Sequence, residues 1–467
     1  MKDEWNGLPP EMKEAVLLSA DSLADPQSVA EIRASLAATE NGQILNTPGN
    51  YRTVFLSDPL LKGAFCYNML TDRVDVVKPL GWQRDSLQVT DVDTQYLMVY
   101  MDKNYHISSE KKIEGAIKMA ANEYRYHPIR DYLNSLQWDG QERVQFALHH
   151  FLGADTSDYI YEALRLFMLG AATRIFKPGT KFETMLCLVG GQGAGKSTFF
   201  RFLAVKDDWF SDDLRKLDDD NVYRKLQGHW IIEMPEMIAT ANARSIEEIK
   251  SFLSRQKDTY KTPYAVHPKD YKRQCVFAGT SNTLDFLPLD RTGNRRFLPV
   301  VVKPELAETH ILENEAESRE YIDQMWAEIM TDYRKNDFKL KLSRKMEQYL
   351  KDYQKDFMPE DTFAARILNY LDSFRGDMVC SLQLYYEALG HPSWGEPKQY
   401  EIRDINSVMN NCAPGWKRFE NPRRFPAPYN RQKGWMRQPD TGNGDGFLPL
   451  SDEEAKQAGI PEEWRKP

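Results

Sequence analysis

Residues 190–197 read Gly-Gly-Gln-Gly-Ala-Gly-Lys-Ser, and this glycine-rich stretch decides the fold. The apolar run 185–189 comes directly before it, and 198–203 follows with the composition of a helix. Strand, glycine loop and helix in this order are typical of a phosphate-binding loop, in which inward-pointing N–H groups and the helix N-terminus hold phosphate oxygens. The alternative is a glycine-rich turn that only matches the pattern, and the flanking strand and helix disfavour it.

Each position of the loop has an expected role in binding ATP and Mg²⁺. Lys196 should reach the β- and γ-phosphates, and the hydroxyl of Ser197 should ligate Mg²⁺. The surrounding backbone should form the phosphate cradle, which comprises Gly190, Gly191, Gln192, Gly193, Ala194, Gly195, Lys196, Ser197 and Thr198. The sequence therefore predicts an ATP site that uses Mg²⁺.

A second apolar stretch, 229–232, ends in Glu233-Met234-Pro235-Glu236. Carboxylates at the C-terminal ends of parallel strands face the ligand crevice. We expect Glu236 to orient the attacking water, with Glu233 as the residue on the metal side or as an alternative base. Two surface glutamates after a strand are the other interpretation, which the loop upstream disfavours.

The third apolar stretch, 275–280, ends in Ser281-Asn282. Asn282 is placed to contact the γ-phosphate or its water, although asparagine is also common in turns. Further along, Arg295 and Arg296 precede another apolar run. An arginine from a neighbouring subunit can stabilise charge on a transferring phosphoryl group. We expect this role for Arg296 and leave it open for Arg295, where an internal ion pair is equally compatible.

The composition fits a large globular protein. The chain has 467 residues, of which 41% are hydrophobic, and a prior of ~100–200 residues per domain implies about two to four domains. The net charge is −8, so any nucleic-acid contact must come from local basic patches. No apolar stretch approaches the ~20 residues of a membrane span, so no membrane partner is expected. Scattered cysteines fit a reducing cytoplasm.

The patterns divide the chain into five parts. We expect an N-terminal α+β domain, an α/β core around a largely parallel sheet, a helical extension, a winged-helix-like domain and a polar tail, at 1–143, 144–304, 305–357, 358–440 and 441–467. The winged-helix-like assignment rests on three helical patterns that precede a hairpin. These helices are expected at 362–374, 382–389 and 400–411.

Within the N-terminal domain, periodicity predicts helices at 11–24, 27–38 and 109–126 and strands at 51–56 and 94–101. Asp91-Val92-Asp93 superficially matches the paired aspartates of a primase metal site. No histidine motif accompanies it. We therefore interpret this stretch as a turn before the strand at 94–101.

Basic residues interleaved with aromatic ones mark two candidate DNA contacts. One lies between the second and third apolar stretches, and its basic residues are Lys261, His267, Lys269, Lys272 and Arg273. The other lies in the winged-helix-like region, with Arg403, Arg423, Arg424, Arg431 and Lys433. Such residues would bind phosphates without reading sequence. A solvated surface hairpin and a protein-docking winged helix are the alternatives that remain open.

The order of these motifs resembles the virulence-associated protein E family of phage and mobile-element ATPases, which is related to the superfamily 3 helicases within the AAA+ class. Besides the glycine-rich loop, the similar stretches are 127–133, 137–140, 248–254, 260–264, 276–282 and 292–297. The resemblance implies an AAA+-like core. It also implies that Asn282 senses the γ-phosphate, that Arg296 is the arginine finger and that the stretch around 260–273 carries a hairpin that grips DNA.

The same resemblance implies a homo-oligomeric, hexameric ATPase that acts on single- or double-stranded DNA in the cytoplasm of a bacterial host. Longer relatives carry a primase, which makes a separate primase a candidate partner. Two functions are compatible with the sequence: a replicative helicase or translocase, and an ATP-switched DNA-binding initiator or regulatory ATPase that does not unwind DNA.

Overall fold

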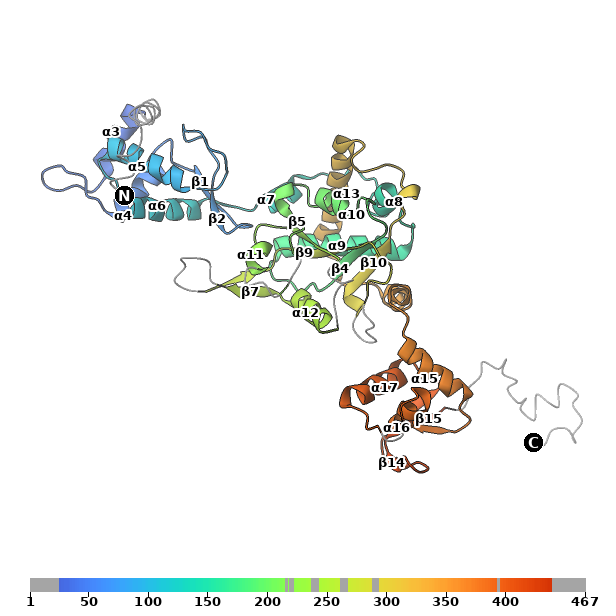
Figure 1. The fold of residues 1–467 in the computed structure, drawn as a ribbon. Helices are drawn as coiled ribbons and strands as arrows, with labels where there is room; N and C mark the ends of the chain where they lie inside the picture. The colour runs from blue at the N-terminus through green and yellow to red at the C-terminus, as the bar shows by residue number, and fades with distance from the viewer. Residues whose placement is uncertain are drawn as a thin grey trace, which may run out of the picture. The chain divides into compact units, whose positions relative to one another are not determined.

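The computed structural model describes residues 25–214, 217, 222–236, 243–260, 268–287, 294–392 and 395–438. In this part of the chain two compact units are formed, one by residues up to 358 and one by residues from 359 onward (Figure 1). Each unit has its own hydrophobic core. The helix expected at 11–24 and the polar tail lie outside the described residues.

The N-terminal part of the first unit combines helices with a small three-stranded sheet around one core. Its elements are α3 (Pro26–Ser35), α4 (Pro48–Ser57), β1 (Phe65–Asn68), β2 (Arg73–Val76), α5 (Asp91–Tyr105), α6 (Glu110–Glu123) and β3 (Arg125–Tyr126). In this sheet β1 pairs with β2 antiparallel and with β3 parallel. The helices expected at 27–38 and 109–126 are confirmed as α3 and α6.

Two stretches that the sequence predicts as strands are helical. Residues 51–56 lie inside α4, where Pro48 occupies the first turn and the Thr47 side chain accepts a hydrogen bond from the backbone of Asn50. Residues 94–101 lie inside α5. In both cases the signals at the helix start outweigh the strand preference of aromatic and β-branched residues.

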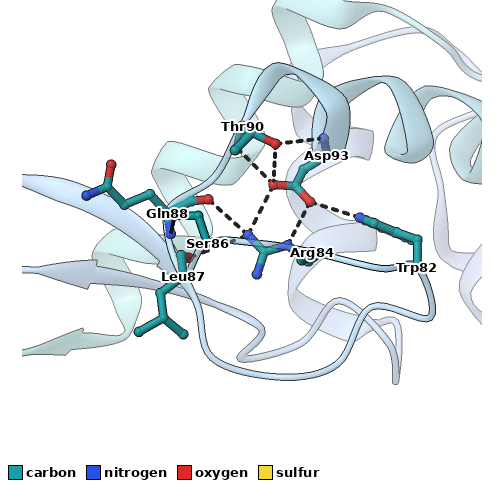
Figure 2. A network of polar contacts seen from close by, with 7 residues as sticks. All are labelled: Trp82, Arg84, Ser86, Leu87, Gln88, Thr90 and Asp93. Atoms are coloured by element: carbon teal, nitrogen blue, oxygen red, sulfur yellow. Dashed lines mark hydrogen bonds and ion pairs between the residues drawn. The ribbon is translucent and has the colours of Figure 1, made fainter.

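Asp93 belongs to the capping box that begins α5, so it does not lie in a turn before a strand. Its carboxylate accepts hydrogen bonds from Trp82 Nε1 (2.8 Å), Arg84 Nε (2.8 Å) and the Thr90 N–H (2.8 Å) (Figure 2). Burial by itself raises the pKa of Asp93, but these hydrogen bonds outweigh it and lower the pKa. The carboxylate is thus used in capping the helix and anchoring the loop before it.

A five-stranded parallel sheet forms the centre of the first unit, with strand order β10-β4-β9-β6-β5. The strands are β4 (Met185–Val189), β5 (Phe210–Ser211), β6 (Ile231–Pro235), β9 (Val276–Ser281) and β10 (Phe297–Val301). Because both faces of a parallel sheet are covered, its strands are near-continuous apolar runs. Neighbouring residues of β4 pack into two different cores, Leu186 in one and Cys187 in the other. This confirms the α/β fold with a parallel sheet.

Helices and short 3₁₀ turns cover the two faces of this sheet (Figure 1). They are α7 (Pro128–Ser135), α8 (Ala147–Leu152), α9 (Asp158–Phe176), α10 (Lys196–Leu203), η1 (Asp207–Trp209), α11 (Val222–Leu226), α12 (Ala243–Ser254), α13 (Glu315–Lys335), α14 (Arg344–Tyr353) and η4 (Gln354–Phe357). The 3₁₀ turns η2 (Asn294–Arg296) and η3 (Pro304–Leu306) flank β10 in the sequence. An antiparallel hairpin of β7 (Lys257–Tyr260) and β8 (Lys269–Lys272) stands between α12 and β9.

The second unit packs helices against a three-stranded antiparallel sheet of order β11-β15-β12. Its elements are α15 (Thr362–Ser373), β11 (Met378–Cys380), α16 (Ser381–Gln383), the π-turn η5 (Leu384–Ala388), α17 (Gln399–Asn411), β12 (Trp416–Arg418), β13 (Arg423–Arg424), β14 (Arg431–Gln432) and β15 (Gly434–Arg437). Among the helices described, none is long and apolar enough to cross a membrane.

Candidate functional site

The glycine-rich loop joins the C-terminal end of β4 to the first turn of α10. Gly190 lies so close to Val302 that an added Cβ would be 2.6 Å from Val302 Cγ2. Gly193 and Gly195 have φ angles of 81° and 78°, which residues with a side chain rarely adopt. Space and backbone conformation therefore require glycine at these three positions. The loop ends at the N-terminus of α10, where the helix dipole favours an anion.

Lys196 ties the loop to the end of β9. Its Nζ donates hydrogen bonds to the carbonyl oxygens of Gly190 (2.6 Å) and Gly191 (2.8 Å) and to Asn282 Oδ1 (3.0 Å). Burial lowers the pKa of the Lys196 ammonium, and the negative charge of Glu236 opposes this effect. Lys196 and Asn282, which the sequence predicted in the same site, are thus in direct contact.

Glu233 lies among hydroxyl groups in the interior of the sheet. Its Oε1 accepts hydrogen bonds from Ser197 Oγ (2.7 Å) and Thr280 Oγ1 (2.6 Å). The side chain is fully buried, and among the described residues its Oε2 has no hydrogen-bond partner. Burial raises the pKa of Glu233, and the two hydroxyls oppose the rise. The contact between Ser197 and Glu233 joins the loop to β6.

Sequence reasoning missed Thr280 and placed Glu233 slightly wrongly. The apolar stretch 229–232 suggested a strand that ends before Glu233. The strand β6 runs from Ile231 to Pro235, so Glu233 lies within it. Thr280 and Ser281 are the two hydroxyl-bearing residues that end an otherwise apolar strand. These hydroxyls were the available signal, because a buried hydroxyl needs a hydrogen-bond partner.

Glu236 and Asn282 meet where β6 and β9 end. Glu236 Oε1 accepts a hydrogen bond from the Asn282 N–H (2.9 Å), and the Glu236 N–H donates to the carbonyl oxygen of Thr280 (3.0 Å). Glu236 has a positive φ of 51°, which turns the chain at the end of β6. Because β6, β9 and β4 are parallel neighbours, these side chains share one edge of the sheet with the glycine-rich loop.

The oxygen donors of this edge fit Mg²⁺ bound together with a nucleotide. Mg²⁺ usually takes one or two carboxylates and completes its shell with phosphate oxygens and water. The Ser197 hydroxyl and the unpartnered Oε2 of Glu233 are oxygens of this kind. In the described part of the chain, no group of His, Cys, Asp or Glu residues is large enough to hold a metal alone. A metal here would therefore depend on the nucleotide.

A family model described as the virulence-associated protein E-like domain matches residues 133–359. Residues 133–359 therefore form a virulence-associated protein E-like domain. The matched range contains the parallel sheet, the glycine-rich loop and the polar residues at its edge. No curated protein matches the chain with significance.

Solved structures with a loosely similar fold include two of the NrS-1 C-terminal region without ligand. The structure titled as residues 305-718 is 13% identical, with a TM-score of 0.45, and covers 80% of this chain and 95% of that chain. The structure titled as the A form is 12% identical, with a TM-score of 0.47, and covers 85% of this chain and 100% of that chain. Similarity at this level supports no argument about activity.

Within the virulence-associated protein E-like domain, the stretch 137–140 forms a structural turn. Asp139 makes a two-pronged ion pair with Arg143, in which the N–O distances are 2.8 and 2.7 Å. This pair lowers the pKa of Asp139 to about 2. The Asp139 N–H donates to Gln324 Oε1 on α13 (3.0 Å). The turn therefore attaches the start of the domain to α13 and takes no part in the site.

Arg295 and Arg296 lie at the opposite end of the sheet from the glycine-rich loop. β10 begins at Phe297, which pairs with Met185 at the start of β4. The glycine-rich loop follows Val189, at the other end of β4. Four strand residues separate the two ends, or about 13 Å along the strand. The virulence-associated protein E-like domain thus presents its loop and its arginines at different edges.

Within one chain both arginines reach the same carboxylate. Arg296 Nη2 lies 3.4 Å from Glu183 Oε2, and its Nε donates to Ser254 Oγ at 3.3 Å. Arg295 Nη2 lies 3.7 Å from Glu183 Oε1, and its side chain is 75% exposed. Glu183 therefore holds Arg296, the less exposed of the two, at the surface of the domain.

The hairpin β7–β8 carries basic residues that mostly have acidic partners. Lys269 Nζ lies 2.6 Å from Asp72 Oδ1, in the N-terminal part of the unit, and Lys257 Nζ lies 2.5 Å from Asp270 Oδ2. Lys272 is exposed. The tip of the hairpin, with the predicted contacts Lys261 and His267, lies outside the described residues. The stem therefore presents less free positive charge than its composition suggested.

Arg273 corrects the predicted DNA contacts. Its side chain is 1% exposed, and its Nε and Nη2 donate to the two carboxylate oxygens of Asp258 at 2.7 and 3.0 Å. The guanidinium also lies 4.3 Å from the centre of the Phe252 ring. Arg273 anchors the hairpin stem to α12 and is closed to DNA.

We expect Arg273→Ala to lower the free energy of unfolding by about 3–5 kcal/mol, because it leaves the buried Asp258 carboxylate without its partner. Chemical denaturation measures this loss. The control is Lys272→Ala at the exposed neighbouring position, where the change should stay within about 0.5 kcal/mol. Unchanged stability of the Arg273 variant together with weaker DNA binding would contradict the structural role.

The second unit exposes all five of its predicted DNA contacts, namely Arg403, Arg423, Arg424, Arg431 and Lys433. Arg403 lies on α17. Arg424 of β13 pairs with Arg431 of β14, so this small hairpin carries several arginines. The Arg423 guanidinium lies 5.0 Å from the centre of the Phe419 ring. Exposed cations beside an aromatic ring are groups that a nucleic-acid backbone can use.

Proposed function

We propose that the chain is an ATP-hydrolysing DNA helicase or translocase of a phage or mobile genetic element, which acts as a homo-oligomeric, hexameric ring. One observation carries the proposal, namely a network of hydrogen bonds beside a glycine-rich loop at the end of a parallel sheet. Lys196, Asn282 and Glu236 are bonded in series, Ser197 is bonded to Glu233, and Thr280 joins the two sets. The match of residues 133–359 to the virulence-associated protein E-like domain supports the mobile-element context.

In this proposal the loop and the N-terminus of α10 bind the triphosphate of ATP. Lys196 exchanges its carbonyl acceptors on Gly190 and Gly191 for β- and γ-phosphate oxygens. Ser197 and Glu233 would hold Mg²⁺, which neutralises phosphate charge when it is bound. The buried position of Glu233 and its contact with Ser197 support a role on the metal side.

Glu236 is the residue that we assign to the attacking water. Its carboxylate is bonded to the backbone of Asn282, whose side chain in turn accepts from Lys196. This chain of contacts connects the water, the γ-phosphate and the end of β9. Glu236 orients the water and accepts its proton, and Asn282 senses whether the γ-phosphate is present.

DNA contacts are assigned to exposed cations in both units. In the first unit these are Lys269 and Lys272 of the hairpin stem. Lys261 and His267, which lie outside the described residues, stay predicted contacts from the sequence. In the second unit, which we propose is a winged-helix-like domain in an AAA+-like protein, they are the exposed residues of α17 and of the β13–β14 hairpin. A separate primase is a candidate partner for the replication function.

A second function is favoured by the ion pairs of the hairpin stem. Lys269 is held by Asp72 and Lys257 by Asp270, so the stem itself offers little free charge for gripping DNA. The exposed arginines of the second unit suit static DNA binding. The alternative is therefore an ATP-switched DNA-binding initiator or regulatory ATPase that does not unwind DNA.

The rate of ATP hydrolysis with and without single-stranded DNA distinguishes the two functions. A helicase or translocase should hydrolyse ATP several-fold faster when DNA is present and should displace a strand from a forked duplex. Duplex DNA without a single-stranded end serves as the control substrate. A hydrolysis rate that is indifferent to single-stranded DNA would contradict the helicase and support the ATP-switched function.

A further inference from the structure

The segment that follows β10 passes beside the glycine-rich loop and is fixed there by its backbone. We call residues 302–312 the strap. The Lys303 N–H donates to the carbonyl oxygen of Leu152 (2.9 Å), and the Glu308 N–H donates to that of His150 (3.1 Å). Gly153 lies so close to the strap that an added Cβ would be 1.9 Å from the Lys303 carbonyl oxygen. The strap therefore has a defined position against α8.

Besides Val302, which packs against Gly190, the strap places the polar residue His310 beside the glycine-rich loop. A Cβ added to Gly195 would lie 3.8 Å from His310 Nε2. The other ring nitrogen, Nδ1, accepts a hydrogen bond from the Leu312 N–H at 3.2 Å. A neutral imidazole whose Nδ1 accepts carries its proton on Nε2. The strap thus places an N–H donor near Gly195, the residue that precedes α10.

This donor has no recorded use within the chain. Among the described residues, no hydrogen-bond acceptor is paired with His310 Nε2, and the side chain is exposed. The position beside Gly195 is the part of a phosphate-binding loop where backbone N–H groups cradle the α- and β-phosphates, while the lysine that follows reaches the β- and γ-phosphates. A donor beside Gly195 therefore lies next to the backbone that would cradle the α- and β-phosphates.

We propose that His310 is a nucleotide-binding residue that donates a hydrogen bond from Nε2 to an α-phosphate oxygen of the nucleotide held by the loop. The inference rests on the proposed function, in that the loop must bind ATP. It adds a second binding element, because His310 comes from the strap and none of the residues assigned above does. The strap would then close the α-phosphate side of the site, opposite the edge formed by Glu233 and Asn282.

The test compares His310→Ala and His310→Gln with the wild-type chain. The Gln side chain keeps an N–H donor, and Glu305→Ala alters another exposed residue of the same strap as a control. We expect His310→Ala to raise the Kd for a fluorescent ADP analogue and the KM for ATP by about 10–100-fold, the effect of one hydrogen bond to a charged group. The value of kcat should change less than twofold, because the contact is the same before and during phosphoryl transfer. His310→Gln should retain most of the affinity.

Several results would overturn this assignment. An unchanged Kd for ADP in His310→Ala would show that no contact exists, and a loss of affinity for ATP alone would place any contact at the γ-phosphate. A lower Tm of the nucleotide-free His310→Ala chain, with equal loss in the Gln variant, would show a structural role. Failure of the wild-type chain to bind ADP or ATP would instead refute the proposed function.

Discussion

Replacing Lys196 by alanine is expected to abolish ATP hydrolysis, with a loss of at least about 100-fold in kcat/KM, because the ammonium makes charge-assisted contacts that strengthen as charge moves onto the phosphates. Steady-state phosphate release measures this loss. Nucleotide affinity should fall less, by about tenfold. In the nucleotide-free chain the Lys196 ammonium already donates to three acceptors, on Gly190, Gly191 and Asn282. Phosphate oxygens therefore replace existing hydrogen bonds, and the net gain in nucleotide affinity is smaller.

Two controls make the Lys196 prediction specific. Lys206→Ala removes an exposed lysine just beyond the same helix and should leave hydrolysis unchanged. Lys196→Arg keeps the positive charge but cannot fit three acceptors placed for an ammonium, so it should also be nearly inactive. Full activity in Lys196→Ala would remove the glycine-rich loop from the reaction and would refute the proposed ATP site.

The sequence predicted the parts of the site that follow directly from strand order. Apolar runs followed by polar residues placed Lys196, Glu233, Glu236 and Asn282 at one edge of a parallel sheet, and the hydrogen bonds among them confirm that they lie together. This succeeded because buried parallel strands are continuous apolar segments whose C-terminal ends share one edge. The roles of these residues in catalysis remain predictions.

Other features depend on partners that lie far apart in the chain. Arg273 looked like an exposed hairpin cation, and only the fold shows Asp258 and Phe252 around it. His310 belongs to no motif, and its place beside Gly195 follows from the way the strap is bonded to α8. The two stretches predicted as strands, 51–56 and 94–101, are helical because capping residues stabilise the helix starts before them. The spacing of apolar residues alone does not detect such caps.

Replacing Arg296 by alanine should lower kcat by about 1000-fold while leaving nucleotide affinity nearly unchanged, as expected for an arginine that acts on the transition state from a neighbouring chain. Its own loop is out of reach, because Arg296 precedes β10 at the opposite end of the sheet and is held there by Glu183. Single-turnover hydrolysis and ADP binding separate the two effects. Arg295→Ala is the matched control, because this more exposed arginine lies farther from Glu183, and its effect should be smaller.

Mixing inactive chains tests whether the arginine acts between subunits. An oligomer of Lys196→Ala and Arg296→Ala chains contains some interfaces in which an intact loop faces an intact arginine, so mixtures should recover part of the wild-type rate although each variant alone is inactive. The recovered rate should be greatest near equal proportions, where such interfaces are most frequent. If no mixture recovers activity although the chains co-assemble, the shared site is refuted. Arg296 then has only a structural role, through its contacts with Glu183 and Ser254. A marked fall in the Tm of Arg296→Ala would point to the same conclusion, since an arginine that serves a neighbour contributes little to its own fold.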